Sequence, residues 1–427
     1  MGRTLTPVAA ASRARTRVKP AVGAAAAARR RWRVSGAVTD RTALRKTPTA
    51  NKREQASTQP ITGEPPRRWR STEASAQHAK HGFNPEQMGM GGAVVHGNYD
   101  HLGEEVEVPP FLRVPKTASI IGAPMSWGQP RAGTDQGSQI LRACGLEDNL
   151  LALEWRIDDK GDLEFDEPTR NDPAIDPTKV QGLAKNCFTV GKGLKKIHDR
   201  VYEAAKEKEF ALILGGDHSL SAGSVSAILR ARPDTGIIWV DAHGDLNTPE
   251  TSPSGNMHGM PLGLMLGLID PTLLPGFEWF KDVPKLNPEQ IVFVGLRDLD
   301  AGERKIIRDH KITAFSMHHV DRFGIGNVMD MAIESLRKPD GSMRPLHLSY
   351  DIDAVDPEVA PSTGTVVRGG LNFREAHYVA EAVGNTGMLG SMDLVEVNPK
   401  LAPGPESEMT AALGMALISS AMGARII

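Results

Sequence analysis

From residue 118 onward, short uninterrupted apolar runs alternate with longer stretches in which apolar residues recur every three to four positions. A strand that is apolar at every position has both of its faces covered, as in a parallel sheet that lies between layers of helices. Strands and helices that alternate over about 310 residues fit one large domain rather than several small ones. The pattern therefore predicts an α/β fold with a parallel sheet of about eight strands.

The strand predictions rest on seven strong runs and one weaker run. The strong runs span residues 119–122, 210–214, 237–240, 291–295, 313–315, 346–350 and 388–395. The weaker run lies near residues 150–157. Between the runs, the periodic segments 190–208 and 221–230 are typical of helices.

Composition excludes several classes of protein. No apolar run approaches the roughly 18 residues that a membrane-spanning helix needs, so we expect no membrane partner. The formal net charge of −2 over 427 residues gives no basic field of the kind that binds nucleic acid, so no nucleic-acid partner is expected either. The two cysteines, Cys144 and Cys187, are too few for a disulfide scaffold, a cysteine-based zinc site or an iron–sulfur cluster.

The first 83 residues differ sharply from the rest, because they hold eighteen Lys and Arg but only four Asp and Glu. An Arg-rich, Ser-containing and acid-poor composition is typical of an organelle transit peptide, and the apolar core of a secretory signal is missing. We therefore predict a disordered targeting arm and linker at residues 1–83, a lead-in segment at 84–117 and the main folded domain at 118–427. The mitochondrial matrix is the preferred destination. A plastid, the cytoplasm, a myristoylated start at Met1-Gly2 and a plain basic tail remain open.

Titratable side chains directly follow four of the predicted strands. In open parallel sheets, ligands bind at the carboxyl ends of the strands, and these ends share one edge. Bare carboxylates gathered there would repel one another and would lose their solvation at a cost of several kcal/mol. The side chains in question are Asp217 and His218, then Asp241, His243 and Asp245, then Asp351 and Asp353, and finally Glu396.

A metal cluster removes this conflict. The segment 241–245 alternates three ligand-type residues with two small ones, so an extended backbone points the three ligands to one side. The segment 351–353 repeats the alternation with two aspartates. Together with His218, the set has four carboxylates and two imidazoles, which balances two divalent cations and suits Mn²⁺, with zinc and iron left open. Two such cations, roughly 3.5–4 Å apart, deprotonate a shared water at neutral pH.

Each motif has an ordinary explanation when it is taken alone. His218 could cap a turn, and the glycines before it could belong to a phosphate-binding loop, although no Lys-Ser/Thr follows them. The segment 241–245 could be a solvated turn, and the segment 351–353 could hold a single Mg²⁺. Six ligand-type residues at three strand ends are hard to obtain by chance, so we favour the metal site.

The same stretches closely resemble the signature blocks of the arginase (ureohydrolase) family. These blocks lie at residues 215–219, 240–248 and 349–357, and the last continues to Thr365. The resemblance covers about residues 117–424. It implies a three-layer α/β/α sandwich, a catalytic domain and two Mn²⁺ per subunit. It also implies two ligand sets that share Asp241 and Asp351: His218, Asp241, Asp245 and Asp351 for one metal, and Asp241, His243, Asp351 and Asp353 for the other.

Substrate choice in this family depends on the loops around the metals. Asn247, Ser254 and Asn256 offer neutral hydrogen bonds, and in arginases the matching positions bind the α-carboxylate of arginine. The segment with Asp298 and Asp300 looks like the family segment whose second aspartate takes the α-ammonium group. Taken without the metal site, the polar loop would be an ordinary surface loop.

The resemblance implies catalytic roles as well. His258 resembles the family's proton shuttle, which suits an imidazole that titrates near neutral pH. Glu396 resembles the carboxylate that grips the guanidinium group, Asp245 is a catalytic metal ligand, and Thr365 lines the same cavity. The implied reaction is the hydrolysis of L-arginine to L-ornithine and urea by a hydroxide that bridges the metals and attacks the guanidinium carbon.

Two other functions stay open. Agmatine or guanidinobutyrate could replace arginine as the substrate, although Asn247 and the segment 298–300 disfavour this. A catalytically silent arginine sensor or scaffold is the second alternative, but it would not need six metal ligands.

Two further pairs of residues bear on the rim of the site and on the assembly of subunits. Val366 follows Thr365 where many relatives have proline, and Arg368 lies two residues further on, which can alter the rim. Arg374 and Glu375 resemble a pair that bridges subunits, so a homotrimer or homohexamer is expected.

Overall fold

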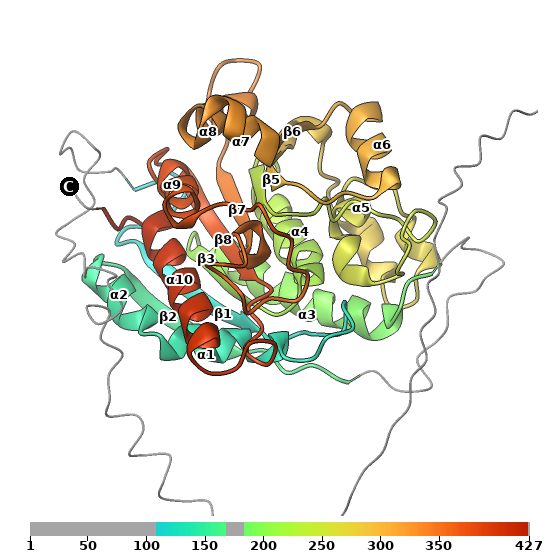
Figure 1. Cartoon of the computed structure of the whole chain (residues 1–427), viewed down its shortest axis with the longest axis horizontal. Helices are drawn as coiled ribbons and strands as arrows, with labels where there is room; N and C mark the ends of the chain where they lie inside the picture. Colours follow the sequence, from blue (N-terminus) through green and yellow to red (C-terminus); the bar gives the residue numbers. More distant parts are fainter. Residues whose placement is uncertain (1–107, 168–182, 426–427) are drawn as a thin grey trace, which may run out of the picture. The chain divides into compact units, whose positions relative to one another are not determined.

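Eight parallel strands form one sheet in the part of the chain that the computed structural model describes, residues 108–167 and 183–425. Their order across the sheet is β2-β1-β3-β8-β7-β4-β5-β6 (Figure 1). The targeting arm expected at residues 1–83 lies outside the described residues, as does the lead-in segment up to residue 107. The predicted α/β class with a parallel sheet of eight strands is confirmed.

All seven strong apolar runs are strands. The strands are β1 (Thr117–Ala123), β2 (Arg156–Asp162), β3 (Phe210–Gly215), β4 (Gly236–Val240), β5 (Ile291–Leu296), β6 (Thr313–Ser316), β7 (Leu346–Asp351) and β8 (Leu389–Val395). In β3, alternate residues enter two different cores: Leu212 and Leu214 pack on one side of the sheet, and Ala211 and Ile213 on the other. Both faces of the strand are therefore dry, which explains its continuous apolar sequence.

The weaker strand prediction, at residues 150–157, is wrong for its first half. Residues up to 152 belong to α2 (Leu146–Ala152), where Leu150 is buried in the core, and β2 begins only at Arg156. The error arises because β2 is a mostly exposed edge strand without an apolar run of its own. Instead, Arg142 of the neighbouring helix forms ion pairs with Asp159 and Asp162 of β2.

Helices cover both faces of the sheet, which confirms the three-layer sandwich (Figure 1). On one face lie α1 (Gly137–Ala143), α2, α7 (Met317–Phe323), α8 (Ile325–Ser335), α9 (Phe373–Gly384) and α10 (Pro405–Ala421). On the other lie α3 (Cys187–Lys206), α4 (Ser221–Ala231), α5 (Pro261–Met265) and α6 (Ala301–Asp309). The predicted helices at 190–208 and 221–230 correspond to α3 and α4. Within the described residues, no helix is both long enough and apolar enough to span a membrane.

The centre of the sheet positions the site. β3, β8, β7 and β4 are direct neighbours, and they are the four strands that the candidate ligands follow. All pairings are parallel, so the four carboxyl ends lie along one stretch of the sheet edge. In open α/β sheets this edge is where ligands bind.

Candidate functional site

The ends of the four central strands bring the candidate ligands together. β3 leads into the short helix η4 (His218–Leu220), β4 ends just before Asp241, β7 ends at Asp351, and β8 ends just before Glu396. Each of these side chains is buried. The backbone N–H of His218 donates a hydrogen bond to Oε1 of Glu396 at 2.9 Å, which joins the ends of β3 and β8.

One cluster of ligand atoms surrounds the ring of His218. Its Nδ1 atom lies 3.0 Å from Oδ2 of Asp241, 3.0 Å from Oδ2 of Asp245 and 3.2 Å from Oδ2 of Asp351. These contacts lack hydrogen-bond geometry, so Nδ1 is a buried polar atom without a hydrogen-bond partner. Three carboxylate oxygens around one imidazole nitrogen match the ligand set of a divalent cation.

The hydrogen bond on the opposite side of the His218 ring determines which ring nitrogen carries the proton. Nε2 of His218 lies 2.9 Å from Oγ of Ser349, and the Ser349 hydroxyl donates to Oδ1 of Asp393 at 2.6 Å. Because the serine hydrogen points to Asp393, the serine oxygen accepts from the imidazole, and Nε2 carries the proton. Nδ1 is then the nitrogen that would present its lone pair to a cation held among the carboxylates, as a metal-ligating histidine does.

A second cluster shares Asp241 with the first. Nδ1 of His243 lies 3.4 Å from Oδ1 of Asp241 and 3.1 Å from Oδ2 of Asp353. Asp241 thus turns Oδ2 toward the first cluster and Oδ1 toward the second. Ligand atoms of His218, Asp241 and Asp351 lie within 4.8 Å of one another, as do those of Asp241, His243 and Asp353. The arrangement provides two adjacent cation positions with one bridging carboxylate.

The pKa values of these buried groups indicate that the clusters favour added positive charge. Burial, together with the charges of Asp353 and Asp241, raises the pKa of Asp351 well above its ordinary value. Burial and the charge of Asp241 also raise the pKa of Asp245 to about 6. Burial disfavours the charged form of His218, but the surrounding carboxylates outweigh this and raise its pKa well above the ordinary value. Protons therefore occupy the cluster where divalent cations would replace them.

Trp239, on β4, holds two of the ligands in place. Its ring stacks on that of His218 with centroids 4.2 Å apart and an angle of 10° between the planes. Its indole N–H donates to Oδ2 of Asp241 at 3.0 Å. One side chain thus fixes both a histidine from β3 and the shared carboxylate of β4, and this leaves the cluster little freedom to relax.

Two of the site residues have strained backbones. Asp245 has φ 49° and Glu396 has φ 64°, in the left-handed region that non-glycine residues avoid. Such conformations cost about 1–3 kcal/mol each and concentrate at functional sites. Asp245 is the last residue of the ligand segment 241–245, and Glu396 directly follows β8. The strained turns therefore aim these two carboxylates into the cluster.

Glu396 has one carboxylate oxygen that is still free. Oε1 accepts from the backbone of His218 and lies 3.4 Å from Nδ1 of His258. Oε2 is buried and has no hydrogen-bond partner. A buried carboxylate oxygen without a donor is costly, so a cationic donor from a ligand would be bound strongly there.

His258 stands between Glu396 and the open side of the site. Its backbone N–H donates to the carbonyl of Gly128 at 3.0 Å, and its side chain is 18% exposed. Burial lowers its pKa, but the hydrogen bond and charge of Glu396 outweigh burial and raise the pKa to about 9. The imidazole can therefore hold a proton at the boundary between the cluster and solvent.

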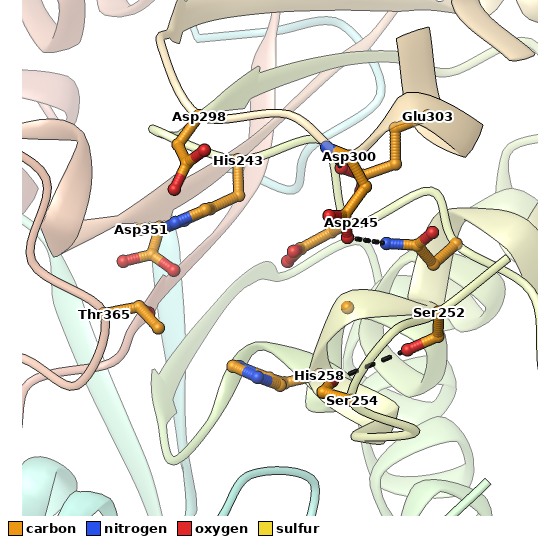
Figure 2. Close-up of a pocket in the computed structure, with 12 residues that line it drawn as sticks. His243, Asp245, Ser252, Ser254, His258, Asp298, Asp300, Glu303, Asp351 and Thr365 are labelled. Atoms are coloured by element: carbon orange, nitrogen blue, oxygen red, sulfur yellow. Dashed lines mark hydrogen bonds between the residues drawn. The ribbon is translucent and has the colours of Figure 1, made fainter. Parts of the chain in front are cut away.

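A pocket of about 130 Å³ opens over the two clusters (Figure 2). His258 and Ser254 lie across it from Asp298 and Asp300, with His243 and Asp351 on one flank. Its predicted lining residues are His243, Asp245, Asn247, Ser254, His258, Asp298, Asp300, Asp351 and Thr365. Four predicted residues are buried around the clusters and do not line the pocket: His218, Asp241, Asp353 and Glu396. The predicted residue Asn256 does not line the pocket either.

The far end of the pocket contains a hydrogen-bonded chain of side chains. The amide of Asn247 donates to Oδ2 of Asp300 at 2.9 Å, and its oxygen accepts from the Thr251 hydroxyl at 2.9 Å. Thr365 lies near the metal end, where its hydroxyl donates to Oδ2 of Asp353 at 3.2 Å. Asn247 therefore has a fixed orientation, with one amide hydrogen left for a ligand.

Sequence analysis missed three residues of the pocket, Ser252, Gly259 and Glu303. Glu303 accepts hydrogen bonds from the backbone N–H groups of Leu246 and Asp300 at 3.1 and 2.8 Å. Burial raises its pKa to about 7. The spacing Asp300-x-x-Glu303 is a capping box at the start of α6, and this signal could have located the helix start and its glutamate beside the site.

Comparisons with known proteins agree on one family. The sequence profile of the arginase family matches residues 116–423. The chain is 45% identical to the arginase of Glaciozyma antarctica over 326 residues, which are 74% of this chain and 91% of that protein. It is 43% identical to arginase-1 of Homo sapiens over 295 residues, 68% of this chain and 88% of that one. The solved structure of the arginase from Bacillus caldovelox matches with a TM-score of 0.66 at 38% identity, over 73% of this chain and 100% of that one.

Proposed function

The chain belongs to the arginase family and is a ureohydrolase, and from this premise we propose that it hydrolyses L-arginine to L-ornithine and urea. The observation that most supports arginine is the pocket's polarity at both ends. A free buried oxygen of Glu396 at the metal end suits a guanidinium group. At the other end, Asn247 and the carboxylates of Asp300 and Glu303 suit an α-carboxylate beside an α-ammonium group.

Two Mn²⁺ ions are the proposed cofactors. Carboxylate and imidazole ligands without thiolates suit Mn²⁺ among the first-row metals, and the free Nδ1 of His218 supports a cation there. When bound, the two cations supply a water acidified to near-neutral pKa as the nucleophile. The proposed ligands are His218, Asp241, Asp245 and Asp351 for one ion and Asp241, His243, Asp351 and Asp353 for the other.

The protein's own groups bind, orient and move protons. Oε2 of Glu396 accepts from the guanidinium and turns its carbon toward the clusters, while Thr365 borders the same space. Asn247 and Ser254 donate to the α-carboxylate, and Asp300 accepts from the α-ammonium. Fixing both ends of a flexible substrate prepares the reacting geometry before the bond is broken.

His258 transfers protons in this proposal. Its ring lies 3.4 Å from Glu396 and is partly exposed, so it can take a proton from the nucleophile's side and return one from solvent to the departing amine. Asp245, which lies 3.0 Å from Nδ1 of His218, completes the catalytic set and would hold a metal together with that histidine.

Urea release from three substrates tests the proposed function. The full chain is assayed with L-arginine, agmatine and guanidinobutyrate, after removal of metal with a chelator and again after addition of Mn²⁺. We expect activity only with metal, and kcat/KM for arginine about 100-fold or more above that for either analogue, because the site's polar groups stay unpaired with an analogue. Faster turnover of agmatine or guanidinobutyrate would instead support the alternative ureohydrolases, and metal-loaded protein without turnover would support the sensor.

Assembly into a homotrimer or homohexamer is part of the proposal. Phe323, Met331, Phe373 and Tyr378 are exposed large apolar residues on the neighbouring helices α7, α8 and α9. Arg374, beside Phe373, belongs to the pair that resembles a subunit bridge. Apolar side chains gathered on one surface are typical of a contact with another subunit.

We also propose that residues 1–83 direct the chain to the mitochondrial matrix, on the basis of their Arg-rich and acid-poor composition. A fluorescent protein fused behind residues 1–83 is expected to coincide with a matrix marker. A matched fusion in which the Arg residues of the first 33 positions are replaced by Gln should stay in the cytoplasm. Plastid or cytoplasmic fluorescence of the unaltered fusion would contradict the mitochondrial assignment.

A further inference from the structure

A second hollow lies at the edge of the sheet opposite to the candidate active site. It is lined by segments that precede three strands: residues 233–234 before β4, 284–290 before β5 and 338–344 before β7. Because the strands are parallel, these amino ends share the edge farthest from the metal clusters. The hollow measures about 410 Å³.

A buried arginine with few partners lies in this hollow. The side chain of Arg344 is 7% exposed. Its Nη1 donates to the carbonyl of Asp234 at a long 3.4 Å, Nη2 lies 3.7 Å from Oε1 of Glu289, and Nε is buried without a partner. A guanidinium has five N–H donors, and buried donors are normally satisfied. The described part of the chain therefore does not supply the acceptors that this guanidinium needs.

Other charges in the hollow favour an anion. Lys285 and Lys338 line it together with Arg344, against the two carboxylates of Asp234 and Glu289. The carboxylates are 66% and 72% exposed, so they lie at the mouth and are screened by water. Arg344 thus makes the buried end of the hollow positive, while nearer the mouth Lys338 donates a hydrogen bond to the exposed Asp234 at 3.2 Å.

We propose that this hollow binds a small oxyanion of the phosphate class, at a site distinct from the active site. The planar fork of a guanidinium matches two oxygens of such an anion, and two ammonium groups line the hollow beside it: Lys338 on the same loop as Arg344, and Lys285 on the loop before β5. Bound there, the anion supplies the missing acceptors of Arg344. It also links the loops that lead into β5 and β7, which carry the basic residues.

Equilibrium dialysis of the full chain with radiolabelled inorganic phosphate tests this. We expect saturable binding of phosphate that Lys338→Met weakens by about tenfold, because a charge-assisted hydrogen bond is lost. Glu289→Gln should tighten binding, because a repelling charge leaves the mouth. Arg344→Met should abolish the site, and the two other variants keep the test valid if this one does not fold.

Lys305→Met is the matched control, because Lys305 also pairs with an exposed aspartate, Asp309, but lies outside the hollow. It should bind phosphate like the unaltered chain, and the basic residues 1–83 are identical in every variant. The proposal is overturned if no binding is found up to about 10 mM phosphate. It is also overturned if Lys338→Met binds as tightly as the parent, or if Lys305→Met loses as much affinity, since the phosphate would then lie elsewhere.

Discussion

The Asp241→Asn variant is expected to bind at least one cation fewer per chain than the parent and to lose about a thousandfold or more in kcat/KM. Asp241 faces both histidine ligands, with Oδ2 toward His218 and Oδ1 toward His243. An amide keeps the shape but removes the charge and one of the two acceptors. Several kcal/mol of cation binding and nucleophile activation depend on it, and about 4 kcal/mol corresponds to a thousandfold in rate.

The surroundings of Asp241 make this loss hard to compensate. Although burial opposes its ionisation, His218 and His243 outweigh burial and lower the pKa of Asp241 well below its ordinary value, so it is ionised at neutral pH. Trp239 donates to the same Oδ2 and would face an amide nitrogen in one of the two amide orientations. In one orientation of the amide, its N–H group opposes the N–H donor of Trp239. In the other orientation, the acceptor that faces His243 is lost.

Metal analysis by mass spectrometry, beside urea release, measures both effects. Asp356→Asn is the matched control, because Asp356 lies just beyond another central strand, β7, but its carboxylate accepts from the backbone N–H groups of Gly369 and Gly370 instead of facing the clusters. It should keep two ions and most of the activity. Two ions per chain and full activity in Asp241→Asn would show that the two-metal assignment is wrong. Thermal melting of both variants separates loss of metal from loss of the fold.

Much of this fold could be predicted because its core strands are buried on both faces. Runs such as the one at 237–240 are apolar at every position, since Ile238 and Val240 enter one core while Ile237 and Trp239 enter the other. The edge strand β2 lacks this signal, because water covers it and its stability comes from ion pairs with a helix. The pattern of apolar residues in a sequence reflects burial, so it gives no signal for a strand that is exposed to solvent.

From the sequence, only the part of the site that lies directly at strand ends could be predicted. Residues that alternate after a strand, as in 241–245, are visible along the sequence. Contacts between distant segments are not: the order of the strands places β8 between β3 and β7, and this brings Glu396 onto the backbone of His218. Glu303 was missed for the same reason, since its place beside the pocket depends on how α6 packs after β5.

The Asn247→Ala variant is expected to lose roughly 10- to 150-fold in kcat/KM for arginine while losing little for agmatine. Asn247 lines the pocket, and its amide is held by Asp300 and by the hydroxyl of Thr251, with one amide hydrogen left for the substrate. Losing one hydrogen bond to a carboxylate costs about 1.5–3 kcal/mol, which corresponds to that range. Agmatine has no carboxylate, so it does not use this donor.

Two further variants separate recognition from chemistry. Thr251→Val removes one of the two groups that orient the Asn247 amide and leaves Asp300 in place, so it should shift the arginine-to-agmatine preference in the same direction by a smaller factor. His258→Ala should slow both substrates alike, because its ring lies beside Glu396 at the metal end, where the two substrates have the same guanidinium group. Steady-state kinetics of urea release on both substrates gives the comparison. Equal losses on arginine and agmatine in Asn247→Ala would show that this residue does not recognise the carboxylate, and the choice of arginine as substrate would then rest on family membership alone.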